Sequence, residues 1–282
     1  MDKAKLRLFF KSLIGVAALG AIICTYGAIH TALQYSDSKK TYEDLNKMVK
    51  VETDAGAPET VTKEIVVETE TREEETVQEE TVNIPVSIDA DFASLKAINN
   101  DVIGWLVYEP VELSYPVVKD KGDDFYEHHS FDLEKNLAGA IFLDYICKPD
   151  LSGYNSIIYG HNMRNGTMFG SLKKVIQDPG LIDQDPYFYI FTEDHAFMYK
   201  IICTYYTTQD SKTYEVNFDY TPDDMKAYLD YMYSVGEYKD EEFFKDPGVT
   251  EDFRMVTLST CHGLHSKERT VIHGVLVAEQ QR

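Results

Sequence analysis

The sequence is poor in cysteine and in positive charge. Among 282 residues there are four cysteines, and 27 basic residues face 48 acidic ones, for a formal net charge of −21. This charge argues against nucleic acid as a partner. Three cysteines lie beyond the first 34 residues, so at least one is unpaired within the chain. Cys147 and Cys203 form either a disulfide or two buried free thiols, and so few cysteines fit a bacterial surface domain better than a disulfide-stapled module.

Lysine, arginine, aspartate and glutamate are absent between Leu13 and Leu33. The apolar stretch reaches the roughly 20 residues that a helix needs to cross a bilayer. Four bases precede it and acidic residues follow, which predicts a cytoplasmic N-terminus. The stretch exceeds the roughly 7–15 apolar residues of a signal peptide, and residues 30–33 form a poor cleavage site. We therefore expect residues 1–34 to be a cytoplasmic N-terminus and an uncleaved transmembrane anchor, with a cleaved signal peptide as the alternative.

Aromatic residues are absent from residues 50–82, where eleven acidic residues outnumber three basic ones. Such a segment buries too little apolar surface to order itself, and repulsion between its charges extends it. The carboxylates lack the spacing of a known calcium loop. We expect residues 35–87 to be an acidic, disordered extracellular tether.

From residue 88 to 282 the composition is that of a globular domain. Helical spacing and caps predict a short helix at 89–98, and Thr221-Pro222 with two acids predicts the start of a second helix. Short apolar runs separated by turn residues predict about eight strands. They are 102–107, 113–118, 140–143, 156–159, 187–191, 196–205, 255–260 and 270–278. This pattern indicates a mainly β domain, either a closed barrel or a sandwich.

Two of the predicted strands carry reactive side chains at adjoining ends. One strand ends on Cys261, and the next opens with Arg269 eight residues later. A thiol at a strand end is exposed enough to react, and an arginine beside it supplies a fixed positive charge near a reacting carbonyl. The pair therefore indicates covalent catalysis.

A catalytic thiol needs a partner that carries protons, and His161 is the best of eight histidines. It follows the apolar run 156–159, and Gly160 lets the chain turn sharply at the strand end. His262 is adjacent to Cys261, so its side chain points to the opposite face of an extended segment. His273 lies in phase with Arg269 and is a weaker candidate.

Several of these segments together resemble the motifs of class B sortases. Thr257-Leu258-Ser259-Thr260-Cys261 followed by an arginine is similar to the sortase signature, and residues 158–163 are similar to the histidine motif. Residues 100–106, 115–118 and 139–144 resemble further segments of that class, and the helix beginning at Pro222 falls where class B sortases insert one. The resemblance covers about residues 88–282.

The resemblance implies an eight-stranded sortase-type β-barrel with an N-terminal helix and an inserted helix before the cysteine strand. It also implies a cysteine transpeptidase on the outer face of a Gram-positive membrane, with no cofactor and no metal. Cys261 would attack the threonine carbonyl of a C-terminal sorting signal, and His161 would exchange protons with the leaving and incoming amines. Arg269 would hold the substrate and stabilise the oxyanion, while Ser259 and Thr260 would line the pocket. The partners would be surface proteins and an amine of a peptidoglycan precursor or a pilin.

The sequence departs from the class at two places. Class B relatives often carry an acid after the cysteine, where this chain has His262, so a third triad member there is in doubt. In the segment that helps to recognise the signal, relatives often show Asp-Asn followed by an aromatic residue and a leucine. By loose alignment this chain has Gly122-Asp123 and Glu127 there, before His128-His129. A carboxylate at Glu127 would favour a basic residue in the sorting signal.

Two alternatives share some of these features. A cysteine peptidase would pass the acyl group to water after the same first half-reaction. A non-catalytic adhesion domain on a stalk would form no adduct at Cys261.

Overall fold

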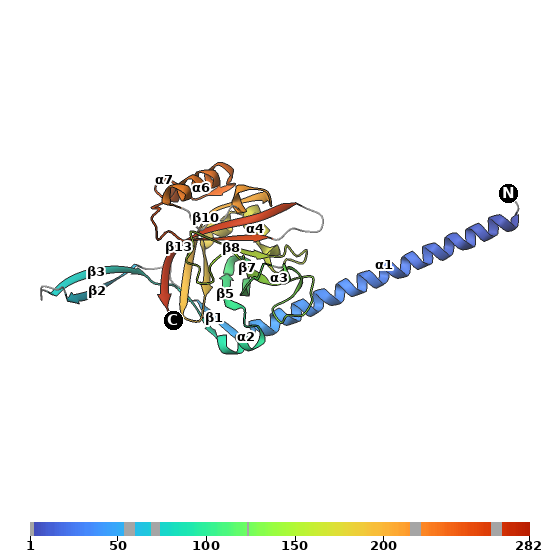
Figure 1. The fold of residues 1–282 in the computed structure, drawn as a ribbon, viewed down its shortest axis with the longest axis horizontal. Coiled ribbons are helices and arrows are strands. Elements are labelled where there is room, and N and C mark those ends of the chain that lie inside the picture. Colours follow the sequence, from blue (N-terminus) through green and yellow to red (C-terminus); the bar gives the residue numbers. More distant parts are fainter. Residues whose placement is uncertain (1–2, 54–59, 69–73, 123, 215–220, 261–266) are drawn as a thin grey trace.

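The barrel consists of eight strands that close on themselves. A computed structural model describes residues 3–53, 60–68, 74–122, 124–214, 221–260 and 267–282 (Figure 1). Around the barrel, each strand pairs with the next in the order β10, β13, β12, β8, β7, β6, β5 and β9, and β9 pairs with β10 to close the ring. Their bounds are β5 (Val102–Tyr108), β6 (Leu113–Lys119), β7 (Ile141–Leu143), β8 (Asn155–Gly160), β9 (Tyr187–Phe191), β10 (His195–Thr208), β12 (Met255–Thr260) and β13 (Glu268–Gln281). The expected closed eight-stranded barrel is confirmed, because closure leaves no edge between β9 and β10.

Helices and short strands surround the barrel. The helices are α1 (Lys3–Asn46), α2 (Phe92–Ile98), α3 (Phe125–His128), α4 (Leu172–Gln177), α5 (Gly180–Gln184), α6 (Pro222–Val235) and α7 (Glu241–Lys245). The other strands are β1 (Val49–Thr53), β2 (Thr60–Glu68), β3 (Glu74–Val82), β4 (Val86–Ala90) and β11 (Tyr238–Lys239). Three-residue 3₁₀ turns lie at Glu109–Val111, Phe169–Ser171 and Lys212–Tyr214.

The two helices predicted from their caps are present where the sequence places them. Asp91 accepts a hydrogen bond from the Ser94 amide at the start of α2. Thr221 and Asp224 form a capping box at the start of α6, with Pro222 at the first helical position. The caps satisfy backbone amides that would otherwise lack partners, which is why the sequence marks these starts so clearly.

Two apolar clusters hold the domain together. The larger fills the barrel, and its fully buried side chains include Trp105, Phe131 and Phe188. The smaller joins the apolar face of α6 to the outer side of β10, β12 and β13, where Met225, Leu229 and Met232 pack with Ile202, Met255 and Val271. The inserted helix is therefore fixed to the strand that ends at Thr260.

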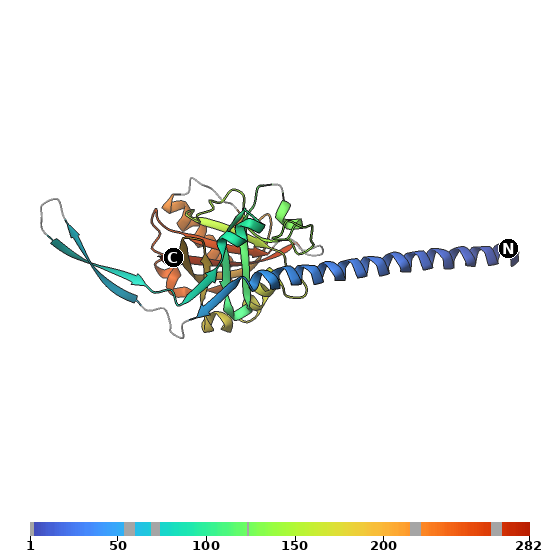
Figure 2. The same ribbon diagram turned by 90° about the horizontal axis from the view of Figure 1, so that it is seen from below.

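Much of the segment expected to be a disordered tether is ordered. Helix α1 continues to Asn46, and β1 pairs with β4. Tyr42, Leu45 and Val49 are buried in the main cluster. The packed region thus begins well before residue 88, and the expectation of disorder over 35–87 is wrong for residues 35–53, 60–68 and 74–87. Strands β2 and β3 form a hairpin that projects from the barrel, while α1 extends away from it on another side (Figures 1 and 2).

The apolar part of α1 packs against nothing in the described structure. An 18-residue window of the helix reaches a mean hydropathy of 1.8, and none of it is buried. Its exposed side chains include Leu13, Ile22 and Leu33. By length and composition the helix is able to cross a membrane, as a signal sequence also is.

Candidate active site

The parallel pairing of β8 and β12 carries the site. In their register, Thr260 lies beside Gly160, the last residue of β8. His161 follows Gly160, and Cys261 follows Thr260 in the sequence. Two strands that run in the same direction end at the same edge of a sheet, so the histidine leaves the sheet beside the strand that leads to the cysteine. Cys261, Asp123 and His262 lie outside the described residues.

Gly160 serves close packing and not a turn. A Cβ at this position would lie 2.3 Å from Ile141 Cδ1 and 2.8 Å from Phe169 Cγ. The φ angle of Gly160 lies outside the left-handed region, and strand β8 extends through this residue. The expectation of a sharp turn at Gly160 is wrong, because the residue remains in β8 and lets two core side chains approach the backbone.

His161 is held by one hydrogen bond on the ring. Its Nε2 lies 2.6 Å from the carbonyl oxygen of Glu127, and the side chain is half-buried. A carbonyl only accepts, so Nε2 carries a proton and donates it. In the neutral ring, Nδ1 is then the basic nitrogen. The contact fixes the tautomer and leaves Nδ1 to exchange a proton.

The Arg269 side chain contacts both the end of β12 and the ring of Tyr214. Its Nη1 donates to the carbonyl oxygen of Thr260 at 3.2 Å. Its guanidinium carbon lies 5.4 Å from the ring centre of Tyr214, within the range of a cation–π contact. The Tyr214 hydroxyl in turn lies 2.7 Å from Ser259 Oγ. The guanidinium is thus fixed next to the residue that precedes Cys261.

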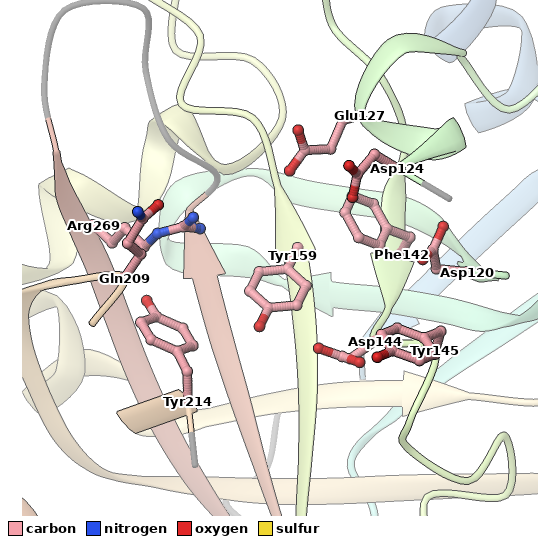
Figure 3. A pocket seen from close by; sticks show the side chains of 10 residues that line it. All are labelled: Asp120, Asp124, Glu127, Phe142, Asp144, Tyr145, Tyr159, Gln209, Tyr214 and Arg269. Carbon is pink, nitrogen blue, oxygen red and sulfur yellow. The ribbon is translucent and has the colours of Figure 1, made fainter. Parts of the chain in front are cut away.

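A cavity of about 250 Å³ opens beside these groups. It is lined by Asp120, Asp124, Glu127, Phe142, Asp144, Tyr145, Tyr159, Gln209, Tyr214 and Arg269. In the view of Figure 3, Arg269 lies to one side of Tyr159 and the four carboxylates lie to the other. Burial, followed by the charge of Asp144, raises the pKa of the Tyr159 hydroxyl, so this phenol remains neutral. The cavity therefore offers one cation at one side and an excess of anions at the other.

Of the other predicted residues, Glu127 lines the cavity, whereas Ser259 and Thr260 do not. Both are fully buried. Thr260 Oγ1 accepts a hydrogen bond from the Thr270 amide at 2.9 Å, which ties β12 to β13. The hydroxyl groups of Ser259 and Thr260 therefore fix the end of β12 through hydrogen bonds and do not line the cavity.

The two buried cysteines are free thiols and not a disulfide. Cys147 contacts the Asn155 carbonyl, and Cys203 contacts the Met232 carbonyl in the other cluster. Burial raises the pKa of Cys147 to about 11 and that of Cys203 to about 12. Both are therefore protonated at neutral pH and unreactive. Neither competes with Cys261 as a nucleophile.

His273 is a structural residue. Its side chain is fully buried; Nδ1 lies 2.8 Å from Thr257 Oγ1 and Nε2 lies 3.0 Å from the Tyr205 hydroxyl. Thr257 gives its own proton to Asn155 Oδ1, so Nδ1 donates to Thr257 and Nε2 accepts from Tyr205. Burial lowers the pKa of His273 to about 3. A neutral ring closed in by partners cannot be the proton carrier.

This burial predicts a pH dependence of stability. The folded pKa of about 3 lies below the ordinary 6.5, so between these values the unfolded chain binds more protons. The free energy of unfolding should therefore fall as the pH drops below about 6.5, by up to about 1.4 kcal/mol per pH unit. Urea unfolding at pH 7.5 and 5.5 measures this loss. His273→Gln should remove much of it, while His128→Gln, at an exposed position, should not; equal losses in both variants would contradict the assignment.

Comparison with known proteins gives the family. A sequence model described as the sortase domain matches residues 108–277. The chain belongs to the sortase family. Sortase B of Listeria monocytogenes is 33% identical over 201 residues, covering 71% of this chain and 79% of that protein. Sortase B of Staphylococcus aureus is 28% identical over 177 residues, covering 62% of this chain and 69% of that protein.

Solved sortase B structures share the fold. Sortase B from Bacillus anthracis in complex with AAEK1 superposes with a TM-score of 0.64 at 25% identity, covering 87% of this chain and 99% of that one. The Staphylococcus aureus sortase B–substrate complex gives 0.59 at 25% identity, covering 66% and 84%. The resemblance to class B sortases is confirmed. The chain is a cysteine transpeptidase of the class that acts on surface proteins, and the reading as a non-catalytic adhesion domain is discarded.

The sequence did not mark several residues of this sortase cavity. Gln209 and Tyr214 reach it from the segment after β10, and no local pattern links that segment to β8. Asp144 follows the short strand β7, which is the same kind of position that drew attention to His161. The position of Asp144, a polar residue directly after an apolar strand, could therefore have marked it as a site residue in the sequence. Gln209 and Tyr214 could be identified only from the three-dimensional structure.

Proposed function

We propose that this sortase cleaves the C-terminal sorting signal of surface proteins through a thioacyl intermediate on Cys261 and joins them to an amine. The observation that carries the proposal is the pairing of Thr260 with Gly160, because Cys261 and His161 are the residues that follow this pair in the two parallel strands. Arg269, bonded to the Thr260 carbonyl, supplies the positive charge at the same strand end.

The proposed reaction has two acyl-transfer steps. The reaction starts from the Cys261 thiolate and a protonated His161, the thiol having passed its proton to the imidazole. The thiolate attacks the threonine carbonyl of the signal, and the carbonyl oxygen becomes an oxyanion that the Arg269 guanidinium stabilises. The C–N bond breaks, His161 gives a proton to the departing amine, and a thioester remains. An incoming amine then attacks the thioester, gives a proton to His161, and leaves with the acyl group in a new amide. The thiolate is restored, so protons and electrons balance over the cycle.

The apolar helix α1 supports a location for this chemistry at the membrane. Residues 13–33 of α1 would cross the membrane, with the bases before them on the cytoplasmic side and the barrel outside. Residues 1–34 are then the anchor, and the acidic stretch around β2 and β3 lies outside the cell. Anchoring concentrates the enzyme with substrates that are themselves held at the membrane. The acceptor is an amine of a peptidoglycan precursor or a pilin.

Product analysis separates transfer from hydrolysis. The full chain in detergent is incubated with a sorting-signal peptide, with and without a glycine or diamino-acid peptide as acceptor. The proposal expects the amide product to form at the expense of the free acid as the acceptor concentration rises. Free acid alone at every acceptor concentration would establish the peptidase reading instead.

The carboxylates on one side of the cavity should influence which sorting signals the enzyme prefers. Glu127 lines the cavity together with Asp120 and Asp144, so a cationic side chain in the signal would find a favourable potential there. Sorting signals contain one position whose residue varies between substrates. We expect peptides with lysine at this variable position to be cleaved faster than those with glutamine, and peptides with glutamate there to be cleaved most slowly.

Glu127→Gln tests this preference. It should reduce the lysine-over-glutamate ratio of kcat/KM by about fivefold, equivalent to about 1 kcal/mol for one partly screened charge pair. Glu134→Gln, an exposed carboxylate on the same segment and outside the cavity, is the matched control. A wild-type chain without any preference for lysine would rule the idea out.

A further inference from the structure

The last turns of α1 bind the segment that leads into the active site. The Tyr42 hydroxyl donates to the carbonyl oxygen of Gly139 at 2.7 Å, in a buried contact. Ser38 Oγ bonds to the Asn136 side chain, and Thr41 Oγ1 donates to Asp132 at 3.1 Å. Three side chains of one helix face thus hold residues 132–139. Figure 2 shows this end of α1 entering the body of the domain.

Gly139 brings that segment against the His161 ring. Its φ is +59°, and a Cβ there would lie 2.5 Å from the Tyr126 carbonyl oxygen and 3.0 Å from His161 Cδ2. The next residue, Ala140, donates its amide to the same Tyr126 carbonyl at 2.9 Å. The chain at Gly139 is therefore packed onto the stretch that contains Glu127, whose carbonyl holds His161 Nε2.

The ring of Tyr42 is fixed as firmly as its hydroxyl. It packs edge-on against Tyr115 with 5.3 Å between ring centres, and only 6% of the residue is exposed. Burial raises the pKa of its hydroxyl, so the group stays protonated and remains a donor. The carbonyl of Gly139 can only accept, so the direction of the hydrogen bond is settled.

We propose that Tyr42 is a positioning residue for His161, acting through the Gly139 carbonyl and the Tyr126–Glu127 backbone. The inference rests on the proposed proton-carrying role of His161. It makes α1 a support of the active site as well as an anchor, because one uninterrupted helix joins the apolar segment to Tyr42. Small errors in the placement of a catalytic group have large kinetic effects, about 10²-fold for a displacement of 1 Å.

The test uses the full chain in detergent and a sorting-signal peptide. Tyr42→Phe removes the hydroxyl and keeps the ring, and it should lower kcat about three- to tenfold with KM unchanged, the effect of losing one hydrogen bond of about 1 kcal/mol. Tyr42→Leu also removes the ring and should lower kcat by about 10². The rate of acyl-enzyme formation in a single turnover should fall by the same factors.

Tyr108→Phe is the matched control. Its hydroxyl also donates to a backbone carbonyl, that of Asp185, and the residue is buried but does not line the cavity. Its kcat should stay within about twofold of wild type when both are assayed well below their unfolding temperatures. If Tyr42→Phe matches Tyr108→Phe in kcat, or if it raises KM and leaves kcat alone, the positioning role is wrong. Either outcome overturns the role whether or not Tyr42→Leu folds.

Two further variants separate this inference from the proposed function. Cys261→Ala in the same preparation should be inactive, and His161→Ala should lose about 10³ in kcat. If Cys261→Ala is active or His161→Ala keeps kcat within tenfold of wild type, the proposed function fails; if both behave as expected while Tyr42→Phe is fully active, only the inference about Tyr42 fails.

Discussion

His161→Ala should lower kcat for a sorting-signal peptide by about 10³, within the range by which general acid–base groups accelerate proton transfer. The histidine has to protonate a departing amine and later accept a proton from an incoming one, and alanine does neither. KM should change little, because the ring, which follows the end of β8, is held by the Glu127 carbonyl and does not line the cavity. Steady-state kinetics with a quenched fluorescent signal peptide give both constants.

His128→Ala is the control for this change. His128 lies at the end of α3, two residues from Tyr126, and is exposed. It should retain near wild-type kinetics. A His161→Ala enzyme with kcat within tenfold of wild type would show that another group carries the proton, and His262, next to Cys261 in the sequence, would be the first to examine.

Arg269→Lys should lower kcat/KM by about 10²–10³, the effect typical of removing an oxyanion donor. Lysine keeps the charge but has one compact ammonium in place of a planar fork. It cannot at the same time donate to the Thr260 carbonyl, lie over the Tyr214 ring and reach a substrate oxygen. A large loss despite an unchanged charge would show that geometry matters as well as electrostatics.

Arg254→Lys is the matched control for Arg269→Lys. Its guanidinium pairs with Glu279 and lies 5.9 Å from the Phe197 ring centre, so it combines an ionic and an aromatic contact away from the cavity. Its kcat/KM should stay within about twofold of wild type. If Arg269→Lys is as active as Arg254→Lys, Arg269 is a structural ligand of β12 and the oxyanion role is wrong.

The sequence predicted those elements whose signals are local. The capping box at Thr221 and the apolar runs that become β5, β8 and β12 depend on neighbours a few residues away. The thiol and the imidazole were recognisable because each follows an apolar strand. Their approach, however, depends on the parallel register of β8 and β12, which no local pattern contains.

The prediction that differs most from the structure is the disorder of residues 35–87, which was inferred from the charge of this segment. Residues 35–53 carry many charges, but Tyr42, Leu45 and Val49 lie on the side that packs against the barrel. The partner of β1 is β4, more than thirty residues further along the chain, and the intervening acidic stretch concealed the pairing. Strands that pair over such a distance leave a weak signal in the sequence, because the contacts that order them come from the rest of the domain.

The central claim is that Cys261 forms a thioester with the signal, assisted by His161 and Arg269. Intact-mass spectrometry of the full chain, quenched in acid soon after mixing with a library of sorting-signal peptides, tests it most directly. The account predicts a mass increase equal to the N-terminal part of the cleaved peptide, located at Cys261, lost on adding hydroxylamine and absent in Cys261→Ala. Cleavage without any adduct in the wild type, or the same adduct in Cys261→Ala, would contradict it.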